Sequence, residues 1–258
     1  MSELEGRTAV LTGAGKTTGI AFAAAQAFGR AGAKIVLADV IDAGESIAAL
    51  TDQGIEAISV ECDVSTADGV AHLKQRVEAR FGGCDILVHA ATLFLIAPIE
   101  EITPQDWHRV VGVNLDAMYY LTHAFVGGMK ERGWGRIIPI SSNSYYVGSG
   151  NRVHYVSSKA ALIGFTRGLA REVGRSGITV NAIVPGVVDT VRDQDPNAPR
   201  DIRFVGRDVY EIVREQQCID MTLRPDHFIG PFMFLATDAS AAMTGQAMLI
   251  DGGWSHIG

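Results

Sequence analysis

Short apolar segments alternate along the chain with longer segments whose apolar residues recur at helical spacing. The short segments predict seven strands, at residues 8–12, 34–39, 56–60, 85–89, 136–141, 178–184 and 247–250. The longer segments predict helices near residues 20–31, 43–53, 67–81, 104–130 and 153–173, the fourth with Thr103 as N-cap and Pro104 in its first position. Strands and helices that alternate at this spacing are typical of βαβ units. We therefore predict an α/β fold: one doubly wound Rossmann domain over residues 1–258, with a seven-stranded, mostly parallel sheet and helices on both faces.

Residues that could bind a ligand follow the predicted strands: Gly13, Asp39, Asp63, His89, Ser142 and Pro185. Ligands of such sheets bind beyond the carboxyl ends of the strands, so we expect the site there. Residues 191–207 break the pattern, because they are polar and contain two prolines and four arginines. We expect a mobile substrate loop within residues 191–215, and a solvated surface loop is the alternative interpretation.

Composition narrows the class of protein. A chain of 258 residues that is 47% hydrophobic fits one large domain, and a net charge of −7 argues against nucleic acid as a partner. No apolar run is long enough to span a membrane, and residues 1–7 are too polar for a secretory signal. Cys62, Cys84 and Cys218 have no pairing or zinc spacing, so we expect thiols in a reducing cytoplasm. The histidines and aspartates form no ligand pattern, so we predict no catalytic metal.

A glycine-rich turn joins the first predicted strand to the first predicted helix. It contains Gly13, Lys16, Thr17, Thr18, Gly19 and Ile20. Glycines let the backbone approach a pyrophosphate closely, and a helix N-terminus supplies N–H groups and partial positive charge. The segment Gly15-Lys16-Thr17 is similar to the end of a nucleotide-triphosphate P-loop, but that motif needs a glycine where this chain has Val10. The turn therefore predicts a dinucleotide site.

Asp39 ends the second predicted strand, about 20 residues beyond Gly19. A carboxylate there accepts hydrogen bonds from the adenosine ribose and repels a 2′-phosphate, which favours NAD over NADP. Lys16 favours the opposite choice, because a cation in the turn could reach that phosphate. An aspartate that merely begins the next turn is the alternative. Asp63, after the third strand, could bind the adenine amine.

The strongest catalytic candidates are Tyr155 and Lys159, which lie four residues apart in a predicted helix and so share one face. A lysine ammonium beside a phenol favours the phenolate, which can act as a general base, and the phenol as a general acid. Ser142 lies thirteen residues before the tyrosine and could hold a substrate oxygen against the phenol. Phe94, Leu95, Tyr145 and Tyr146 follow strand ends and could form an apolar substrate wall.

With these residues placed, the chain resembles the short-chain dehydrogenase/reductase family over essentially its whole length. The matching motifs are Thr12-Gly13 to Gly19, Asp63, Asn114 within Val113-Asn114-Leu115, Ser141-Ser142, Tyr155 with Lys159, Asn181 to Gly186, and Thr244-Gly245-Gln246 with Asp251-Gly252-Gly253. Within that family it is similar to secondary alcohol dehydrogenases of the phenylethanol type, through residues 133–138 and 163–167.

The resemblance implies a role for each matching position. Tyr155 would be the acid/base, Lys159 would assist it and bind the nicotinamide ribose, Ser142 would orient the substrate oxygen, and Asn114 would hold a water in a proton relay to Lys159. Further cofactor contacts would come from Val64, His89, Ala90, Pro185, Gly186, Val188 and Thr190. The family also implies a homotetramer.

Two positions depart from the family pattern. Thr17 stands where the glycine turn usually has its middle glycine, and a β-carbon there could restrict the approach of a pyrophosphate. His89-Ala90-Ala91-Thr92 stands where the family has Asn-Asn-Ala-Gly, so His89 could replace one hydrogen bond while Ala90 cannot replace the other.

The function predicted from the sequence is hydride transfer between a nicotinamide cofactor, NAD in preference to NADP, and a small secondary alcohol or ketone. Two alternatives remain open at this point. One is an NADPH-dependent reductase of a carbonyl or 3-oxoacyl group, which Lys16 and the arginines of residues 191–207 favour. The other is a non-catalytic protein that binds or senses NAD, which the departures at Thr17 and His89-Ala90 favour.

Overall fold

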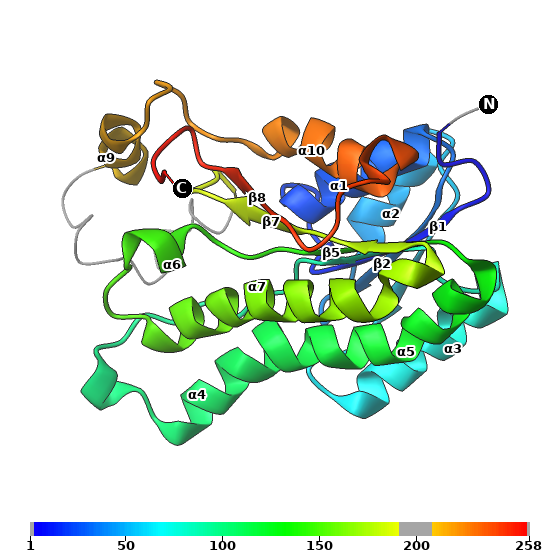
Figure 1. Ribbon diagram of the computed structural model, residues 1–258, viewed down its shortest axis with the longest axis horizontal. Coiled ribbons are helices and arrows are strands. Elements are labelled where there is room, and N and C mark those ends of the chain that lie inside the picture. The colour runs from blue at the N-terminus through cyan, green and yellow to red at the C-terminus, as the bar shows by residue number, and fades with distance from the viewer. Residues whose placement is uncertain (1–2, 191–207, 257–258) are drawn as a thin grey trace.

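The computed structural model describes residues 3–190 and 208–256, which form a parallel sheet with helices on both faces (Figure 1). The strands are β1 (Thr8–Thr12), β2 (Lys34–Asp39), β3 (Ala57–Glu61), β4 (Ile86–His89), β5 (Gly135–Pro139), β6 (Ile178–Val180), β7 (Ala182–Pro185) and β8 (Ala247–Ile250). Six of them form a sheet in the order β3-β2-β1-β4-β5-β6, and β7 pairs with β8; every pairing is parallel. The predicted doubly wound α/β fold is confirmed.

The strand count differs from the prediction at one place. A single strand was expected over residues 178–184, but Asn181 divides it into β6 and β7. The Asn181 side chain explains the break, because its Oδ1 accepts from the Gln246 N–H at 3.1 Å and its Nδ2 donates to the Met243 carbonyl at 2.8 Å. A bridge between Ile140 and Ile183 still links β7 to the chain that follows β5. The β7-β8 pair therefore continues the main sheet.

Helices form two layers, one on each face of the sheet. They are α1 (Ile20–Arg30), α2 (Gly44–Thr51), α3 (Ala67–Phe81), α4 (Pro104–Val111), α5 (Ala117–Arg132), α6 (Ser144–Val147), α7 (Val153–Val173), α9 (Val209–Gln216) and α10 (Ile229–Ala236). Short 3-10 turns cover Ile99–Glu101, Gly174–Ser176, Pro225–Phe228 and Asp238–Ser240. Figure 1 shows α1, α2 and α10 on one face, and α3, α4, α5 and α7 on the other. Within the described residues, no helix has both the length and the apolar character needed to cross a membrane.

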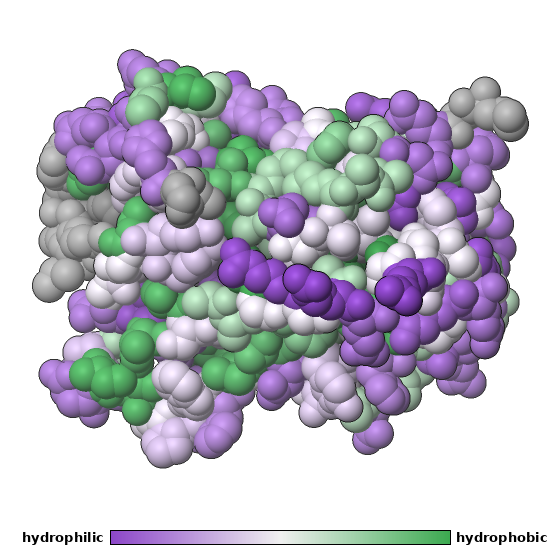
Figure 2. Space-filling model, viewed as in Figure 1, coloured by the Kyte–Doolittle hydropathy of each residue, from purple (hydrophilic) through white to green (hydrophobic). Residues whose placement is uncertain are grey.

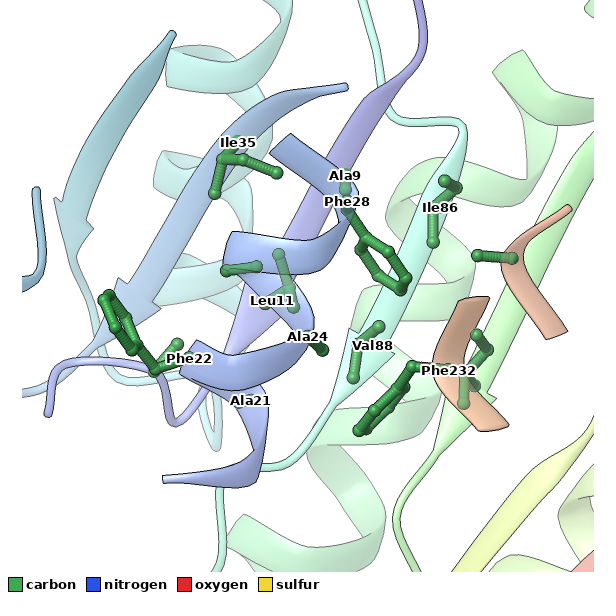
Figure 3. Packing of buried hydrophobic residues seen from close by; sticks show 14 of the residues in the cluster. Ala9, Leu11, Ala21, Phe22, Ala24, Phe28, Ile35, Ile86, Val88 and Phe232 are labelled. Atoms are coloured by element: carbon green, nitrogen blue, oxygen red, sulfur yellow. The ribbon is translucent and has the colours of Figure 1, made fainter. Parts of the chain in front are cut away.

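Each face of the sheet has its own hydrophobic core. Side chains alternate along β1, so Leu11 packs toward α1 and α10 while Val10 packs toward α3, α5 and α7. In the first core, the rings of Phe28 and Phe232 meet edge to face at 6.2 Å (Figure 3). Because both faces are covered, the strands are apolar at nearly every position rather than at alternate ones.

The long helix predicted over residues 104–130 is interrupted in the structure. Its start is as predicted, since Pro104 occupies the first turn and the Thr103 side chain accepts from the Asp106 N–H at 3.0 Å. Gly112–Asp116 then form a π-helical turn, and a regular helix resumes as α5. One wide turn hardly alters a helical pattern of apolar residues, which is why periodicity did not reveal it.

Residues 191–207, which include the four arginines of the predicted loop, lie outside the described residues. The next described residue is Asp208, whose Oδ1 accepts from the Tyr210 N–H at 2.9 Å and so caps α9. The last part of the range predicted as a loop, from Val209, is therefore helical.

Candidate active site

A cleft of about 740 Å³ opens beyond the carboxyl ends of the strands, at the end of the molecule where α6 and α9 lie (left in Figure 1). Its wall contains residues that directly follow β1, β2, β3, β4, β5 and β7. These segments converge because all the strands are parallel, so their carboxyl ends share one edge of the sheet. The volume lies in the range typical of ligand sites, about 300–1,000 Å³.

Gly13 makes the tight turn of the glycine-rich segment possible. Its φ is +68°, and a β-carbon there would lie 2.6 Å from the backbone N and Cα of Ala91. No other residue type fits such an approach without moving the chain. The cleft wall then continues through Lys16, Thr18 and Gly19 to Ile20, at the N-terminus of α1. Gly19, the N-cap residue, leaves the N–H groups of the first turn without a side-chain cap, which suits an anionic ligand.

Thr17 does not line the cleft. Its side chain is exposed to solvent, and its backbone has no positive φ, since Asn151 is the sole non-glycine residue with positive φ within the described ranges. The departure from the family glycine is therefore accommodated by an ordinary turn. The structure does not bring Thr17 to the wall where the sequence placed it.

Asp39 is fixed in the wall by backbone donors. Its Oδ2 accepts from the Gly15 N–H at 2.8 Å, and its Oδ1 accepts from the Val40 N–H at 2.8 Å. Gly15 must be glycine for this contact, since a β-carbon would lie 2.9 Å from Oδ2 and 2.7 Å from Ile41 Cγ1. Each carboxylate oxygen keeps a second lone pair, so Asp39 can still accept from ribose hydroxyls.

His89 lies behind the wall rather than in it. The Thr12 Oγ1 accepts from the N–H groups of Ala90 and Ala91, at 3.2 Å each, so its own hydrogen is directed to His89 Nδ1 at 2.9 Å. Nδ1 is therefore an acceptor, and the imidazole carries its proton on Nε2. Burial, and secondarily the charge of Lys159, lowers the pKa of His89 to about 3. A neutral histidine thus braces the turn, and Ala90, the next residue, lines the cleft.

Tyr155, Lys159 and Ser142 meet in the same cleft. Lys159 is 2% exposed, and its Nζ lies 5.8 Å from the centre of the Tyr155 ring and donates to the Ile140 carbonyl at 2.9 Å. The edge-to-face contact with Phe94, at 4.9 Å between ring centres, fixes the plane of the tyrosine ring. Ser142 Oγ accepts from the Ser144 N–H at 3.1 Å, which fixes the serine oxygen. The phenol, the ammonium and the hydroxyl are thus held together.

Asn114 is fully buried in the π-helical turn and is not part of the cleft wall. Its Oδ1 accepts from the Leu93 N–H at 2.8 Å and from Thr92 Oγ1 at 3.2 Å. Its Nδ2 donates to the Leu93 carbonyl at 3.1 Å and to Ser158 Oγ at 3.0 Å. The side chain therefore uses all its donors and acceptors to tie the segment after β4 to α7.

Most of the predicted site residues line the cleft together. They are Gly13, Lys16, Thr18, Gly19, Ile20, Asp39, Asp63, Val64, Ala90, Phe94, Ser142, Tyr155, Lys159, Pro185, Gly186, Val188 and Thr190. Besides Thr17, His89 and Asn114, the predicted residues outside the wall are Leu95, Tyr145 and Tyr146. The two tyrosine rings lie 3.9 Å apart and pack near Ile163 and Val184 instead.

Sequence reasoning missed several residues of the wall, including Arg152, Tyr210 and Trp254. The sequence did contain a signal that could have placed Arg152 in the wall, because Arg152 precedes Tyr155 by three residues and so begins the same helical face. Tyr210 was not singled out by itself, although it lies within residues 191–215, the segment predicted as a substrate loop; its hydroxyl donates to Asp189 Oδ1 at 3.1 Å.

Comparison with known proteins agrees with this geometry. A family model described as enoyl-(acyl carrier protein) reductase matches residues 13–255. The chain belongs to the short-chain dehydrogenase/reductase family. Relatives of this short-chain dehydrogenase/reductase include a D-beta-hydroxybutyrate dehydrogenase from Cupriavidus necator, 33% identical over 97% of this chain and 98% of the relative. Another is a 3-oxoacyl-[acyl-carrier-protein] reductase from Pseudomonas aeruginosa, 34% identical over 97% of this chain and 98% of the relative.

Solved structures give the same result. A crystal structure of a proposed NAD(P) dependent gluconate 5-dehydrogenase from Beutenbergia cavernae, with NADP bound at low occupancy, has a TM-score of 0.86 and 35% identity, and the match covers 98% of each chain. The protein is therefore an NAD(P)-dependent short-chain dehydrogenase/reductase, as the motifs predicted. Enzymes of this family transfer a hydride between a nicotinamide cofactor and an alcohol or carbonyl group.

Proposed function

We propose that the protein transfers a hydride between NAD and a secondary alcohol or its ketone, with Tyr155 as the acid/base. One observation carries the proposal: Tyr155, Lys159 and Ser142 line the same cleft as the glycine-rich turn and Asp39. A dinucleotide bound along that turn would therefore end beside the groups that can move a proton. The nicotinamide supplies the hydride acceptor or donor.

The residues of the wall fit a dinucleotide. The backbone from Gly13 to Gly19 and the start of α1 would hold the pyrophosphate, with Lys16 beside it. Asp39 would accept from the adenosine ribose, and Asp63 and Val64 would contact the adenine. The nicotinamide end would lie against the segment after β7. That segment contributes Pro185, Gly186, Val188 and Thr190.

Three side chains would transfer the proton or stabilise the charge that develops during the reaction. In oxidation, the Tyr155 phenolate would accept the alcohol proton, and in reduction the phenol would return it to the developing alkoxide. Lys159 would stabilise the phenolate electrostatically and donate to the nicotinamide ribose. The Ser142 hydroxyl would donate to the same substrate oxygen and so stabilise negative charge on it.

Asn114 would act in the proton relay through its backbone. Its side-chain donors and acceptors are already used by Leu93, Thr92 and Ser158. A carbonyl of the π-helical turn would hold a water on the path to Lys159, since wide turns of this kind recur at functional sites.

NAD is the proposed cofactor because Asp39, which two backbone donors hold at the end of β2, would accept from the adenosine ribose and repel a 2′-phosphate. Moving this carboxylate away would leave the Gly15 and Val40 N–H groups without their acceptor, which disfavours NADP. A second candidate, an NADPH-dependent reductase of a carbonyl or 3-oxoacyl group, is favoured by Lys16 in the same wall. The relative named as a 3-oxoacyl-[acyl-carrier-protein] reductase favours this candidate, and so does the similar solved structure with bound NADP.

A non-catalytic NAD-binding protein is the weaker alternative. Its support came from Thr17 and His89-Ala90, yet Thr17 lies outside the wall and His89 Nδ1 is hydrogen-bonded to Thr12 Oγ1 at 2.9 Å. The test is reduction of NAD or NADP, followed by absorbance, over a panel of secondary alcohols. We expect turnover with NAD that exceeds turnover with NADP. Binding of both cofactors without turnover on any alcohol or ketone would favour the sensor.

We also propose that the enzyme is a cytoplasmic homotetramer. Trp107, Tyr119 and Val153 are exposed large hydrophobic side chains of α4, α5 and α7. Figure 2 shows hydrophobic residues gathered on the part of this face where those helices lie in Figure 1. A face of this kind is typical of an interface between subunits. Light scattering coupled to gel filtration should give four times the 27.5 kDa chain mass, and a monomer mass would contradict the proposal.

A further inference from the structure

The motif after β8 has no role in the proposed reaction. Asp251, Gly252 and Gly253 follow that strand directly, and Asp251 is 3% exposed. A carboxylate that is taken out of water needs hydrogen-bond donors, because its burial is otherwise costly. The donors around Asp251 therefore indicate what this side chain is for.

Four N–H groups donate to the Asp251 carboxylate. Its Oδ1 accepts from the N–H groups of Gly253 and Trp254, at 3.1 and 3.2 Å. Its Oδ2 accepts from the Ser255 N–H at 2.8 Å and from Asn143 Nδ2 at 3.2 Å. A carboxylate has about four acceptor positions, so these donors use its whole capacity. Three of the bonds are local and close the turn after β8, whereas the fourth comes from a residue 108 positions earlier in the chain.

Asn143 lies between Ser142 and the start of α6 and is held from two directions. Its buried side chain reaches Asp251, and its backbone N–H donates to the Pro185 carbonyl at 2.9 Å. The next N–H along the chain, that of Ser144, donates to Ser142 Oγ at 3.1 Å. The turn that holds the serine oxygen is thus fixed to the ends of β7 and β8.

Asp251 also contacts the wall segment that follows β7. A β-carbon on Gly186 would lie 2.9 Å from Asp251 Cβ, so the backbone of this wall residue packs directly against the aspartate. The Gly186 N–H donates to the Ile250 carbonyl at 2.9 Å. Asn143 and Trp254, two bonding partners of Asp251, line the cleft as well. Asp251 therefore lies where the wall segments after β5, β7 and β8 meet.

We propose that Asp251 is a positioning residue for Ser142 and acts through its bond to Asn143. This inference rests on the proposed function, because it takes the Ser142 hydroxyl as the donor to the substrate oxygen. Such a donor is effective when it is held where negative charge develops, and a displacement of about 1 Å can lower the rate about 100-fold. Asp251 itself lies outside the cleft wall and transfers no proton.

Asn143→Ala removes the distant bond and keeps both Ser142 and the local turn of Asp251. In turnover with NAD on the best alcohol of the panel, kcat should fall about tenfold, and NADH affinity should stay near that of the native enzyme. Asn181→Ala is the matched control, because Asn181 is also a buried asparagine bonded to the segment before β8, but it lies outside the cleft. It should lower the free energy of unfolding and leave kcat unchanged. An equal fall of kcat in both variants would overturn the positioning role.

Two further comparisons separate positioning of Ser142 from a general loss of stability. In a Ser142→Ala background, Asn143→Ala should lower kcat by less than about twofold, since no hydroxyl is left to position. The exchanged pair, Asn143→Asp with Asp251→Asn, should recover part of the activity lost in either single variant, because the carboxylate and the amide have traded places. A loss in the Ser142→Ala background as large as in the native background would overturn the inference.

Hydrogen exchange distinguishes failure of this inference from failure of the proposed function. Mass spectrometry of the peptide over residues 141–148 should show faster amide exchange in Asn143→Ala than in the native protein or in Asn181→Ala. Turnover of no alcohol would contradict the proposed function, yet faster exchange would still support the hold of Asp251 on the Ser142 turn. Exchange at the native rate in Asn143→Ala would overturn the positioning role, whether or not the enzyme turns over.

Discussion

The Thr12 hydroxyl donates a hydrogen bond to Nδ1 of His89 across the β1–β4 pair, at 2.9 Å. This bond fixes the tautomer of a fully buried histidine and leaves the threonine oxygen to accept two N–H groups of the next turn. A residue that departs from the family motif thus supports the cleft wall from behind.

His89 should make stability depend on pH. Its folded pKa is lowered to about 3, whereas an unfolded histidine has a pKa near 6.5. Below about pH 6.5 the unfolded chain binds a proton that the folded chain does not. The stabilising contribution is therefore complete above that pH and is lost as the pH falls toward 3. The loss is about 1.4 kcal/mol per pH unit.

Urea unfolding of the native protein and His89→Asn, at pH 7 and pH 5, measures this contribution. The amide oxygen of asparagine can still accept from Thr12, but the side chain does not titrate. Between the two pH values the native protein should lose about 2 kcal/mol more than the variant. His72→Asn, at an exposed position, should behave as the native protein does. An equal pH dependence in His89→Asn would contradict the buried neutral histidine.

Gly13→Ala should harm both stability and cofactor binding. Its β-carbon would lie 2.6 Å from Ala91 at a φ of +68°, so the turn must shift. We expect a loss of about 1–3 kcal/mol in the free energy of unfolding, and weaker binding of NADH in a fluorescence titration. Gly164→Ala is the control, because that helical glycine has open space around it, and it should stabilise slightly. Native affinity in Gly13→Ala would refute the role of the turn.

Asp39→Asn should relax the preference for NAD. The asparagine oxygen can keep the hydrogen bond from Gly15, while the negative charge that repels a 2′-phosphate is removed. We expect the ratio of kcat/KM for NAD to that for NADP to fall about tenfold or more, equivalent to about 1.4 kcal/mol. Asp52→Asn, at the exposed C-cap of α2 outside the cleft, should leave the ratio unchanged. An unaltered ratio in Asp39→Asn would rule out the ribose contact.

Local sequence patterns correctly predicted many of the helices and strands. The helix over residues 67–81 has the predicted bounds: in the structure Thr66 caps its start by accepting from the Gly69 N–H, and Gly82 ends it at a φ of +83°. The strand over residues 247–250 also has the predicted bounds. The convergence of Gly13, Asp39, Ser142 and Tyr155 also followed from the sequence, since parallel strands bring their carboxyl ends to one edge.

Other features depend on contacts between distant segments, which no local pattern records. Asn181 divides a strand because of its bonds to residues 243 and 246, and Asn114 lies in a π-helical turn bonded to Leu93 and Ser158. His89 was predicted to touch the cofactor, but its direction was set by Thr12 on the neighbouring strand. The place of Arg152 in the wall depends on Phe94, which is far from it in the chain.

Tyr155→Phe tests the central claim most directly, by turnover with NAD on the best alcohol of the panel and by titration with NADH. The change removes the oxygen that would carry the proton and keeps the ring that packs against Phe94. Tyr120→Phe, which alters a half-buried tyrosine of α5 outside the cleft, serves as the control. We expect kcat to fall by at least about 100-fold in Tyr155→Phe, with NADH affinity near that of the native enzyme and full activity in the control. Turnover in Tyr155→Phe within a few-fold of the native rate would contradict the assignment of Tyr155 as the acid/base.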